Sequence, residues 1–357
     1  MRLVIARKLL LDAVSIVSSI ITPNPFKEIF SCVSLGESNG KLELACFNIE
    51  EWIKLDMTPE EFDCEKGCEA NIKATVLLNI LKNADSENVT IETDMDKAII
   101  TYGKSTSKVP LHKSETYRSF STQDAPMLVI DTKDFKDAIE NVGFVSDSDI
   151  LINKTKTDFE FATRSANLLS YSSFTSQNDT EFYLTIGASL QNTIKKVIEL
   201  CDEHILVGVA KNGMLHISNK TGSVYAGLRK TEVNPYRYKN IIDGTPIETE
   251  IERSVLMKVV AQSVSASDNK SAVADVSIVN KAVVAKHKGG ASQTKAKKDS
   301  DYSGDAMVFR INGSELIKSL KSCRNERIKV ALTDKAFFIK DDENRIIVIS
   351  RSVERNA

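Results

Sequence analysis

The chain has 357 residues, which is enough for two or three domains that each bury a core of their own. Its hydrophobic content of 42% and its charged content of 27% are typical of a globular protein. The net charge of −2 excludes a polycation, so any positive surface for nucleic acid would have to be confined to one face.

Six short amphipathic helices are predicted along the chain, each followed by sequence that alternates like a strand. The first, within residues 9–21, resembles a secretory signal, but Asp12 interrupts it and Pro23 stands where a cleavage site would be. Asp131 or Thr132 is expected to cap the third helix and Asn312 the sixth. The apolar anchors of the six helices are Leu10, Leu77, Phe135, Leu190, Leu256 and Leu316.

A repeat of roughly sixty residues is a unit that cannot bury its apolar face alone, so neighbouring units must pack together. Turn signals at 38–41 and 211–213 predict hairpins between the helices. Polar breaks at 119–126 and 240–246 group the units in pairs and predict three domains, 1–122, 123–244 and 245–357. The predicted fold class is α+β, with duplicated β-α-β-β units and helices on one face of antiparallel sheets. The Lys-, Gly- and Ser-rich stretch 286–304 is expected to be a mobile hairpin tip or a disordered insertion.

Motifs for catalysis, metal binding and membrane insertion are missing from the sequence. Cys64 and Cys68 have a zinc-like spacing, but no second Cys or His pair completes four ligands, so a thiol-bearing loop is expected in place of a metal site. The other four cysteines are expected to be reduced and buried. There is no glycine-rich phosphate loop and no hydrolase motif, which predicts a non-enzyme without cofactors. No stretch is long and apolar enough to span a membrane, which predicts a cytoplasmic protein.

Several local patterns resemble, in order and spacing, those of the bacterial DNA sliding clamp family, the beta subunit of DNA polymerase III. Residues 1–10 with Pro25 downstream are similar to the family's first repeat, and 73–77 to its second helix. Residues 161–168 are similar to the centre of its middle domain. Residues 234–239 are similar to the end of that domain, where a proline precedes a strand rich in Tyr and Arg. Residues 302–304, 309–320 and 332–334 are similar to the third domain.

This resemblance implies a head-to-tail homodimer that forms a ring of six domains. The helices would line a hole around double-stranded DNA, which would be held without sequence specificity. The ring would carry no catalytic chemistry and would tether a DNA polymerase and a clamp loader through short peptide motifs. The competing hypothesis is a clamp-like monomeric scaffold or decoy that binds replication proteins without encircling DNA.

The resemblance places DNA-facing residues on the helices and in the loop after the first helix. For any single cation among them, an ordinary solvated helix position is an equally good interpretation. The third helix disagrees with this role, because Asp131, Asp134, Asp137 and Glu140 would repel phosphate. The candidate DNA-binding residues are Arg7, Lys8, Asn24 (where the family often has Arg), Lys73, Lys82, Lys195, Lys196, Lys258 and Lys318.

The family's partner-peptide pocket lies between the middle and last domains, and the resemblance carries it onto this chain. Residues 164–167 and the polar tail after Ser350 depart from the family pattern, which predicts a different peptide preference. A sealed domain junction without a ligand is the alternative. The candidate pocket residues are Thr163, Leu168, Pro235, Lys239, Asn240, Asn312, Ala336, Phe338, Val348 and Ser350.

The ring interface is expected to place Val109 and Leu111 of one copy against Val264 of the other. Small residues surround Val264 in the sequence, which is thin for an obligate apolar interface. The dimer is therefore expected to be weak, or to be held mostly by strand pairing across an edge.

Overall fold

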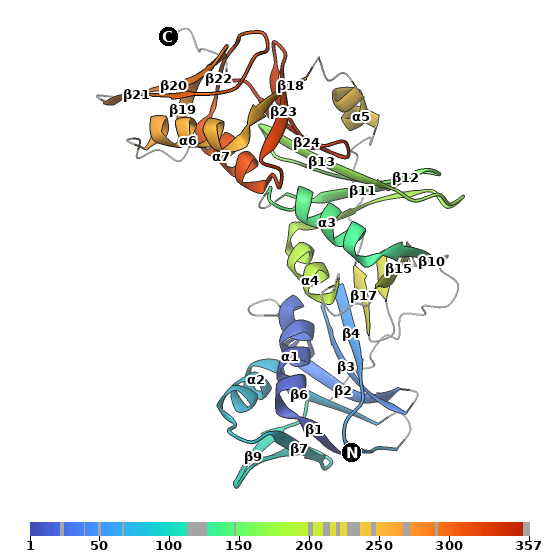
Figure 1. Cartoon of the computed structure of the whole chain (residues 1–357). Helices are drawn as coiled ribbons and strands as arrows, with labels where there is room; N and C mark the ends of the chain where they lie inside the picture. The colour runs from blue at the N-terminus through green and yellow to red at the C-terminus, as the bar shows by residue number, and fades with distance from the viewer. Residues whose placement is uncertain are drawn as a thin grey trace. The chain divides into compact units, whose positions relative to one another are not determined.

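The computed structural model divides the chain into two compact units (Figure 1). The first contains residues 1–136 and 189–229, and the second contains residues 137–188 and 230–357. The structure describes residues 1–21, 25–38, 40–48, 51–65, 68–112, 127–145, 148–198, 203–209, 215–218, 222–226, 236–243, 248–265, 267, 272–289 and 292–352.

All six predicted helices are present, and the anchor residues whose side chains are described are fully buried. The helices bury the apolar stripe that carries the anchor, as expected for helices that cover a sheet. The predicted caps are confirmed: Asp131 Oδ1 accepts from the N–H groups of Lys133 and Asp134, at 2.8 and 3.2 Å. Asn312 Oδ1 accepts from Glu315 N–H at 3.1 Å. The six helices are α1 (Arg7–Val17), α2 (Ala74–Asn83), α3 (Thr132–Val142), α4 (Ala188–Ile198), α6 (Arg253–Val264) and α7 (Gly313–Ser322).

The first unit contains two antiparallel sheets, against which α1 and α2 bury one apolar core. Its smaller sheet has the order β5 (Glu61–Asp63), β1 (Arg2–Ala6), β7 (Asn88–Thr93), β8 (Lys97–Tyr102) and β9 (Ser105–Pro110). Its eight-stranded sheet has the order β10 (Met127–Asp131), β15 (His204–Val209), β16 (Leu215–Ser218), β17 (Gly222–Ala226), β4 (Glu51–Met57), β3 (Lys41–Phe47), β2 (Cys32–Ser38) and β6 (Glu69–Lys73). Two short 3-10 helices, Ser18–Ile20 and Glu28–Ser31, precede β2.

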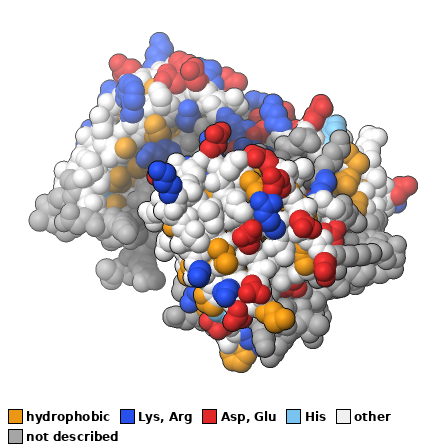
Figure 2. Space-filling view, turned by 90° about the horizontal axis from the view of Figure 1, so that it is seen from below, with side chains coloured by type: hydrophobic (Ala, Val, Ile, Leu, Met, Phe, Trp, Pro, Cys, Tyr) orange, Lys and Arg blue, Asp and Glu red, His pale blue; other side chains and the backbone are white. Residues whose placement is uncertain are grey.

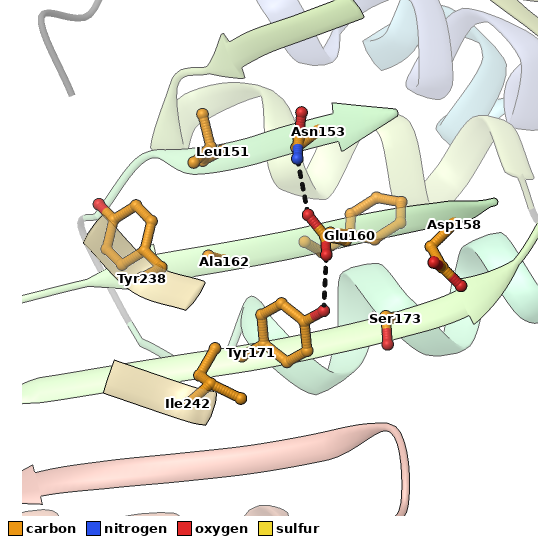
Figure 3. Close-up of a pocket in the computed structure, with 10 residues that line it drawn as sticks. Leu151, Asn153, Asp158, Glu160, Ala162, Tyr171, Ser173, Tyr238 and Ile242 are labelled. Carbon is orange, nitrogen blue, oxygen red and sulfur yellow. Dashed lines mark hydrogen bonds between the residues drawn. The ribbon is translucent and has the colours of Figure 1, made fainter. Parts of the chain in front are cut away.

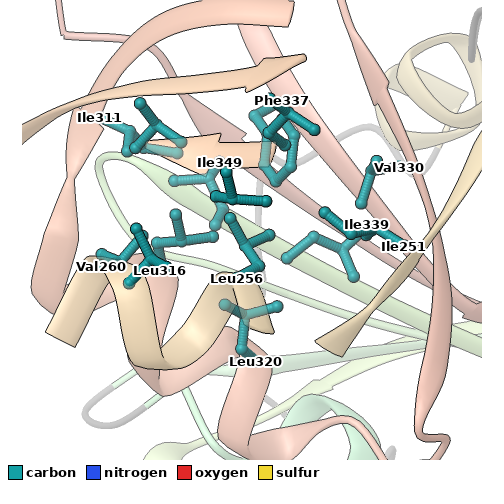
Figure 4. Packing of buried hydrophobic residues seen from close by; sticks show 14 of the residues in the cluster. Ile251, Leu256, Val260, Ile311, Leu316, Leu320, Val330, Phe337, Ile339 and Ile349 are labelled. Atoms are coloured by element: carbon teal, nitrogen blue, oxygen red, sulfur yellow. The ribbon is translucent and has the colours of Figure 1, made fainter. Parts of the chain in front are cut away.

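The second unit repeats this plan with another eight-stranded sheet and a four-stranded sheet. The larger has the order β14 (Phe182–Ile186), β11 (Ile150–Lys154), β12 (Asp158–Arg164), β13 (Leu168–Thr175), β25 (Arg345–Ser350), β24 (Ala336–Asp342), β23 (Arg327–Leu332) and β18 (Thr249–Glu252). The smaller has the order β21 (Ser292–Asp299), β20 (Ala282–Gly289), β19 (Val273–Val279) and β22 (Met307–Asn312). Leu256, Leu316 and Phe337 meet in the core between these sheets and helices α6 and α7 (Figure 4).

A matching pair of arginines shows the internal duplication in atomic detail. Arg7, the first residue of α1, donates to the carbonyls of Leu81 and Ser86 at the end of α2, both at 3.1 Å. Arg253, the first residue of α6, donates in the same way to the carbonyls of Leu320 and Cys323, at 3.1 and 2.8 Å. Both guanidinium groups satisfy carbonyls that a helix C-terminus leaves without partners.

The structure corrects three expectations. Residues Tyr236–Asp243 form a helix, α5, where a Tyr/Arg-rich strand was expected. The stretch 286–304 is not a disordered insertion: most of it lies in the hairpin strands β20 and β21, in register from Ala282–Asp299 to Gly289–Ser292, and the tip at 290–291 lies outside the described residues. Small buried residues, Ala285 and Ala296, take the inward positions that large apolar residues usually mark.

The third correction concerns the cysteines. Cys64 and Cys68 are paired as a disulfide, with Cα atoms 6.2 Å apart, and do not form a thiol-bearing loop. Cys32, Cys46 and Cys323 are free and buried, as expected, whereas Cys201 lies outside the described residues. In the described part of the chain, no three His, Cys, Asp or Glu side chains are grouped to hold a metal ion.

The division into two units cuts through the predicted middle domain, because continuous sheets join that segment to both neighbours. Strand β17 pairs with β4 in the first unit, and β13 pairs with β25 in the second. The predicted boundaries at 122/123 and 244/245 lie outside the described residues, so the three-domain division stays a prediction.

Candidate nucleic-acid interface and partner site

Most of the candidate DNA-binding lysines lie exposed on helices or at their starts. Lys8 is on α1, Lys73 directly precedes α2, and Lys82 is in its last turn. On the face shown in Figure 2, basic and acidic side chains are interspersed. In the second unit, Lys258 on α6 and Lys318 on α7 are exposed. Each of these ammonium groups is therefore accessible to a phosphate.

The structure does not place the other four candidates as exposed lysines of this kind. The Arg7 guanidinium donates hydrogen bonds to carbonyls at the C-terminal end of α2, so its main contribution is to the stability of the fold. Lys195 on α4 is half-buried, and the side chain of Lys196 is not described. Asn24 lies outside the described residues.

The acidic character of α3 has a structural explanation in the second unit. Asp137 and Glu140 form ion pairs with Arg324, which follows α7, with N–O distances of 2.9 and 3.2 Å. The hydrogen bond to Asp137 is the main cause that raises the pKa of the Arg324 guanidinium. Asp131 caps the helix, as described above. All three carboxylates therefore have local roles. The positive charge of Arg324 compensates the negative charges of Asp137 and Glu140.

The candidate pocket residues divide between two sides of the large sheet in the second unit. Leu168 is 4% exposed and packs into the main core of the unit. Thr163 is also buried, and its hydroxyl donates to Asp149 O at 3.0 Å. Phe338 and Val348 belong to a separate apolar cluster that includes Tyr238 of α5.

The remaining pocket candidates lie around these two clusters. Ser350 is exposed at the end of β25, and its N–H donates to Asn167 O at 2.8 Å. Asn240 is exposed on α5, Ala336 packs against the cluster of Phe338, and Asn312 caps α7. Pro235 lies outside the described residues, and the side chain of Lys239 is not described.

A cavity of about 190 Å³ lies between α5 and strands β11, β12 and β13 (Figure 3). Glu160 lies within it and accepts hydrogen bonds from Asn153 Nδ2 at 2.6 Å and from the Tyr171 hydroxyl at 3.2 Å. Burial is the main cause that raises the pKa of Tyr171, so its hydroxyl stays a donor. Tyr238 and Ile242 of α5 close one side of the cavity. A partner group there would meet apolar side chains near α5 and polar atoms at the opposite end, where Asp158 and Ser173 lie.

Sequence reasoning missed this cavity because α5 was not expected. Tyr238 and Ile242 are four residues apart, which puts them on one helical face, but eight residues without a longer apolar period carry too weak a signal. The alternation of Glu160 with buried Phe159 and Phe161 is visible in the sequence and marks the outward face of β12.

The residues expected at the ring interface lie at or near sheet edges. Val109 is 5% exposed on β9, the last strand of its sheet, and Leu111 directly follows that strand. Val264 is the last residue of α6 and is half-buried. Among the described helices, none has the length and hydrophobicity that crossing a bilayer requires.

Known proteins are similar to this chain in sequence or in fold. Residues 1–121 match the family of the DNA polymerase III beta subunit, N-terminal domain. No curated protein matches the sequence.

Several solved structures are similar to the whole chain. The DNA polymerase III beta subunit of Thermotoga maritima is 13% identical, with 99% of each chain covered and a TM-score of 0.88. A putative beta subunit of Eubacterium rectale is 17% identical, covering 99% of this chain and 100% of that one, with a TM-score of 0.87. A sliding clamp of Pseudomonas aeruginosa, solved bound to griselimycin, is 13% identical over 99% and 100%, with a TM-score of 0.89.

The predicted resemblance to this family is confirmed, at low identity, and so is the α+β fold. Residues 1–121 thus match the N-terminal domain of the DNA polymerase III beta subunit in sequence, and the whole chain has the fold of beta subunits.

Proposed function

We propose that the protein is a sliding clamp, a ring of two copies that encloses double-stranded DNA and tethers a replicative polymerase. The observation that carries the proposal is the similarity to beta subunits over 99% of the chain. It extends across both compact units, so it concerns the helices and sheets of each. The family is non-catalytic, and a tether acts by raising the local concentration of the polymerase at its template.

Exposed lysines on the helices support contact with the DNA backbone. Their flexible ammonium groups attract phosphates without reading bases, which a sliding protein requires. The ion pairs of Arg324 with Asp137 and Glu140 reduce the repulsion that α3 would otherwise add. The proposed DNA contacts are Lys8, Lys73, Lys82, Lys195, Lys196, Lys258 and Lys318.

Partners are proposed to bind where α5, the β12–β13 turn and the chain end after β25 come together. Exposed Asn240 and Ser350 would contact a short peptide there, beside the apolar cluster of Phe338 and Val348. Pro235 and Lys239 stay part of the predicted pocket, whereas Thr163 and Leu168 are buried on the other side of this sheet and Asn312 caps α7, so these three are not proposed as peptide contacts. A polymerase and a clamp loader in the cytoplasm would present such peptides.

The decisive experiment combines solution mass with DNA synthesis. A mass near twice the 39.5 kDa of one chain, measured by light scattering over a dilution series, would support the ring. Primer extension on a long single-primed circle should then give longer products when the protein and a cognate loader are present. A monomer at every concentration, with product lengths unchanged, would contradict the ring and favour the monomeric scaffold.

A further inference from the structure

Strands β9 and β21 are two of the eight edge strands that the four described sheets have. Strand β9 ends the five-stranded sheet, and β21 ends the four-stranded sheet. Each leaves a row of backbone N–H and C=O groups without strand partners on one side, which is a template for another strand. In the proposed ring, β9 of one copy would lie beside β21 of the next, and we call this contact the seam. The seam exists only if the proposed function is correct.

Both edges carry lysines on their outward faces, and on β21 the exposed Gln293 and Asp299 flank them. Ala296 of β21 is 9% exposed and packs in the core with α6, so Lys295 and Lys297 point to the opposite, outward face. Val109 of β9 is buried, so Lys108 points outward by the same alternation. All three lysines are exposed. None of them has an ion-pair partner among the described residues, whereas Asp275 on the same outward face is paired with Arg310 at 2.7 Å.

The pairing geometry brings these charges together. We assume that all six residues of β9 pair within the eight residues of β21, and that outward side chains of one strand lie opposite outward side chains of the other. Only a few pairing registers then remain. In an antiparallel pairing Lys108 falls opposite Lys295, and in a parallel pairing it falls opposite Lys295 or Lys297. Like charges directly opposite on neighbouring strands are destabilising.

We infer that the seam between two copies of this chain repels itself through Lys108 and the pair Lys295 and Lys297, so that dimerisation tightens as ionic strength rises. Salt shortens the range of the repulsion from about 10 Å at 0.1 M to about 3 Å at 1 M. DNA binding has the opposite dependence, because salt weakens phosphate contacts. The two effects therefore separate in a titration without DNA.

The test is sedimentation equilibrium of the full chain from about 0.05 to about 1 M NaCl. The dimer dissociation constant should fall by roughly tenfold or more over this range. Lys108→Glu alone, and Lys295→Glu with Lys297→Glu, should each tighten the dimer at low salt and remove or reverse the salt effect. Combining all three substitutions places like charges opposite again and should return the dimer to its weak, salt-promoted state. Lys335→Glu, at an exposed lysine away from both edges, is the matched control.

Each outcome decides between the two proposals. A dimer whose affinity is constant or falls with salt, and does not respond to the charge changes, overturns the repulsive seam and leaves the ring standing. A monomer at every salt concentration, in the original chain and in both charge-reversed variants, overturns the ring and this inference with it.

Discussion

Replacing Arg345 with Met should destabilise the second unit strongly, because it leaves a buried carboxylate without its counter-charge. The Arg345 Nη1 to Asp341 Oδ2 distance is 2.8 Å, and each side chain is 1% exposed. Asp341 also accepts from the N–H groups of Arg324 and Asn325, at 2.9 and 3.0 Å, so it fixes the turn after α7. Arg345 Nη2 donates to the Ser322 hydroxyl at 3.0 Å.

The magnitude follows from the cost of an unpaired buried charge. Breaking such a pair by removing one partner costs about 3–5 kcal/mol. For a folding unit of this size, about 2–4 °C of midpoint is lost per kcal/mol, so the thermal midpoint should fall by about 6–20 °C. Circular dichroism during heating, together with urea titration, measures both quantities.

Two further variants make the reasoning refutable. Adding Asp341→Asn to Arg345→Met should recover part of the lost stability, because the amide oxygen still accepts from the turn and carries no charge. Arg327→Met is the matched control, since that arginine pairs with Glu250 at 3.2 Å in an exposed position, and it should hardly move the midpoint. Equal shifts in Arg345→Met and Arg327→Met would refute the assignment of a buried pair.

Three other expectations can be checked by mutation or titration. Arg7→Met should lower the free energy of unfolding by about 1–2 kcal/mol in urea, because it removes two hydrogen bonds from a helix end, while the exposed neighbour Lys8→Met should not. Lys82→Glu and Lys258→Glu should weaken DNA binding and flatten the plot of log Kd against log salt by about one for each lost phosphate contact, and an unchanged slope would exclude these lysines from the interface. Burial lowers the pKa of His216 from 6.5 to about 4, so the unfolded chain takes up its proton first as the pH falls. The contribution of neutral His216 to the free energy of unfolding should therefore be fully present above pH 6.5. It should decrease toward pH 4 by up to about 1.4 kcal/mol per pH unit, and His216→Gln should flatten that dependence.

The helices were predictable because each carries its own signal. Leu256, Val259 and Val260 repeat at helical spacing, and all are buried. Asn312 and Glu315 show a cap within four residues of sequence. Elements stabilised by tertiary contacts gave weaker signals. The hairpin of β20 and β21 uses alanine and a buried histidine, His287, as its inward residues, and the exposed lysines between them dominate its composition.

The candidate site was less predictable, because its residues depend on partners far away in the chain. The acidic residues of α3 suggested repulsion from DNA until Arg324, 184 positions after Glu140, was found beside them. Arg7 suggested a phosphate contact, but it is held by carbonyls of α2. Leu168 was expected to face a peptide, and its 4% exposure means that Leu168→Asp would disrupt the core as well as any pocket.

The pairing of β4 with β17 has a consequence for biosynthesis. On the ribosome, β4 emerges long before its partner, because Gly222 follows Met57 by 165 residues, the difference of the two positions. At about 5–20 residues per second, the edge of β4 stays uncovered for roughly 10–30 s. An uncovered edge recruits strands from neighbouring nascent chains. Slow translation of 58–221 should therefore favour aggregation, and a chaperone that shields β4 during this interval should raise the yield of folded protein.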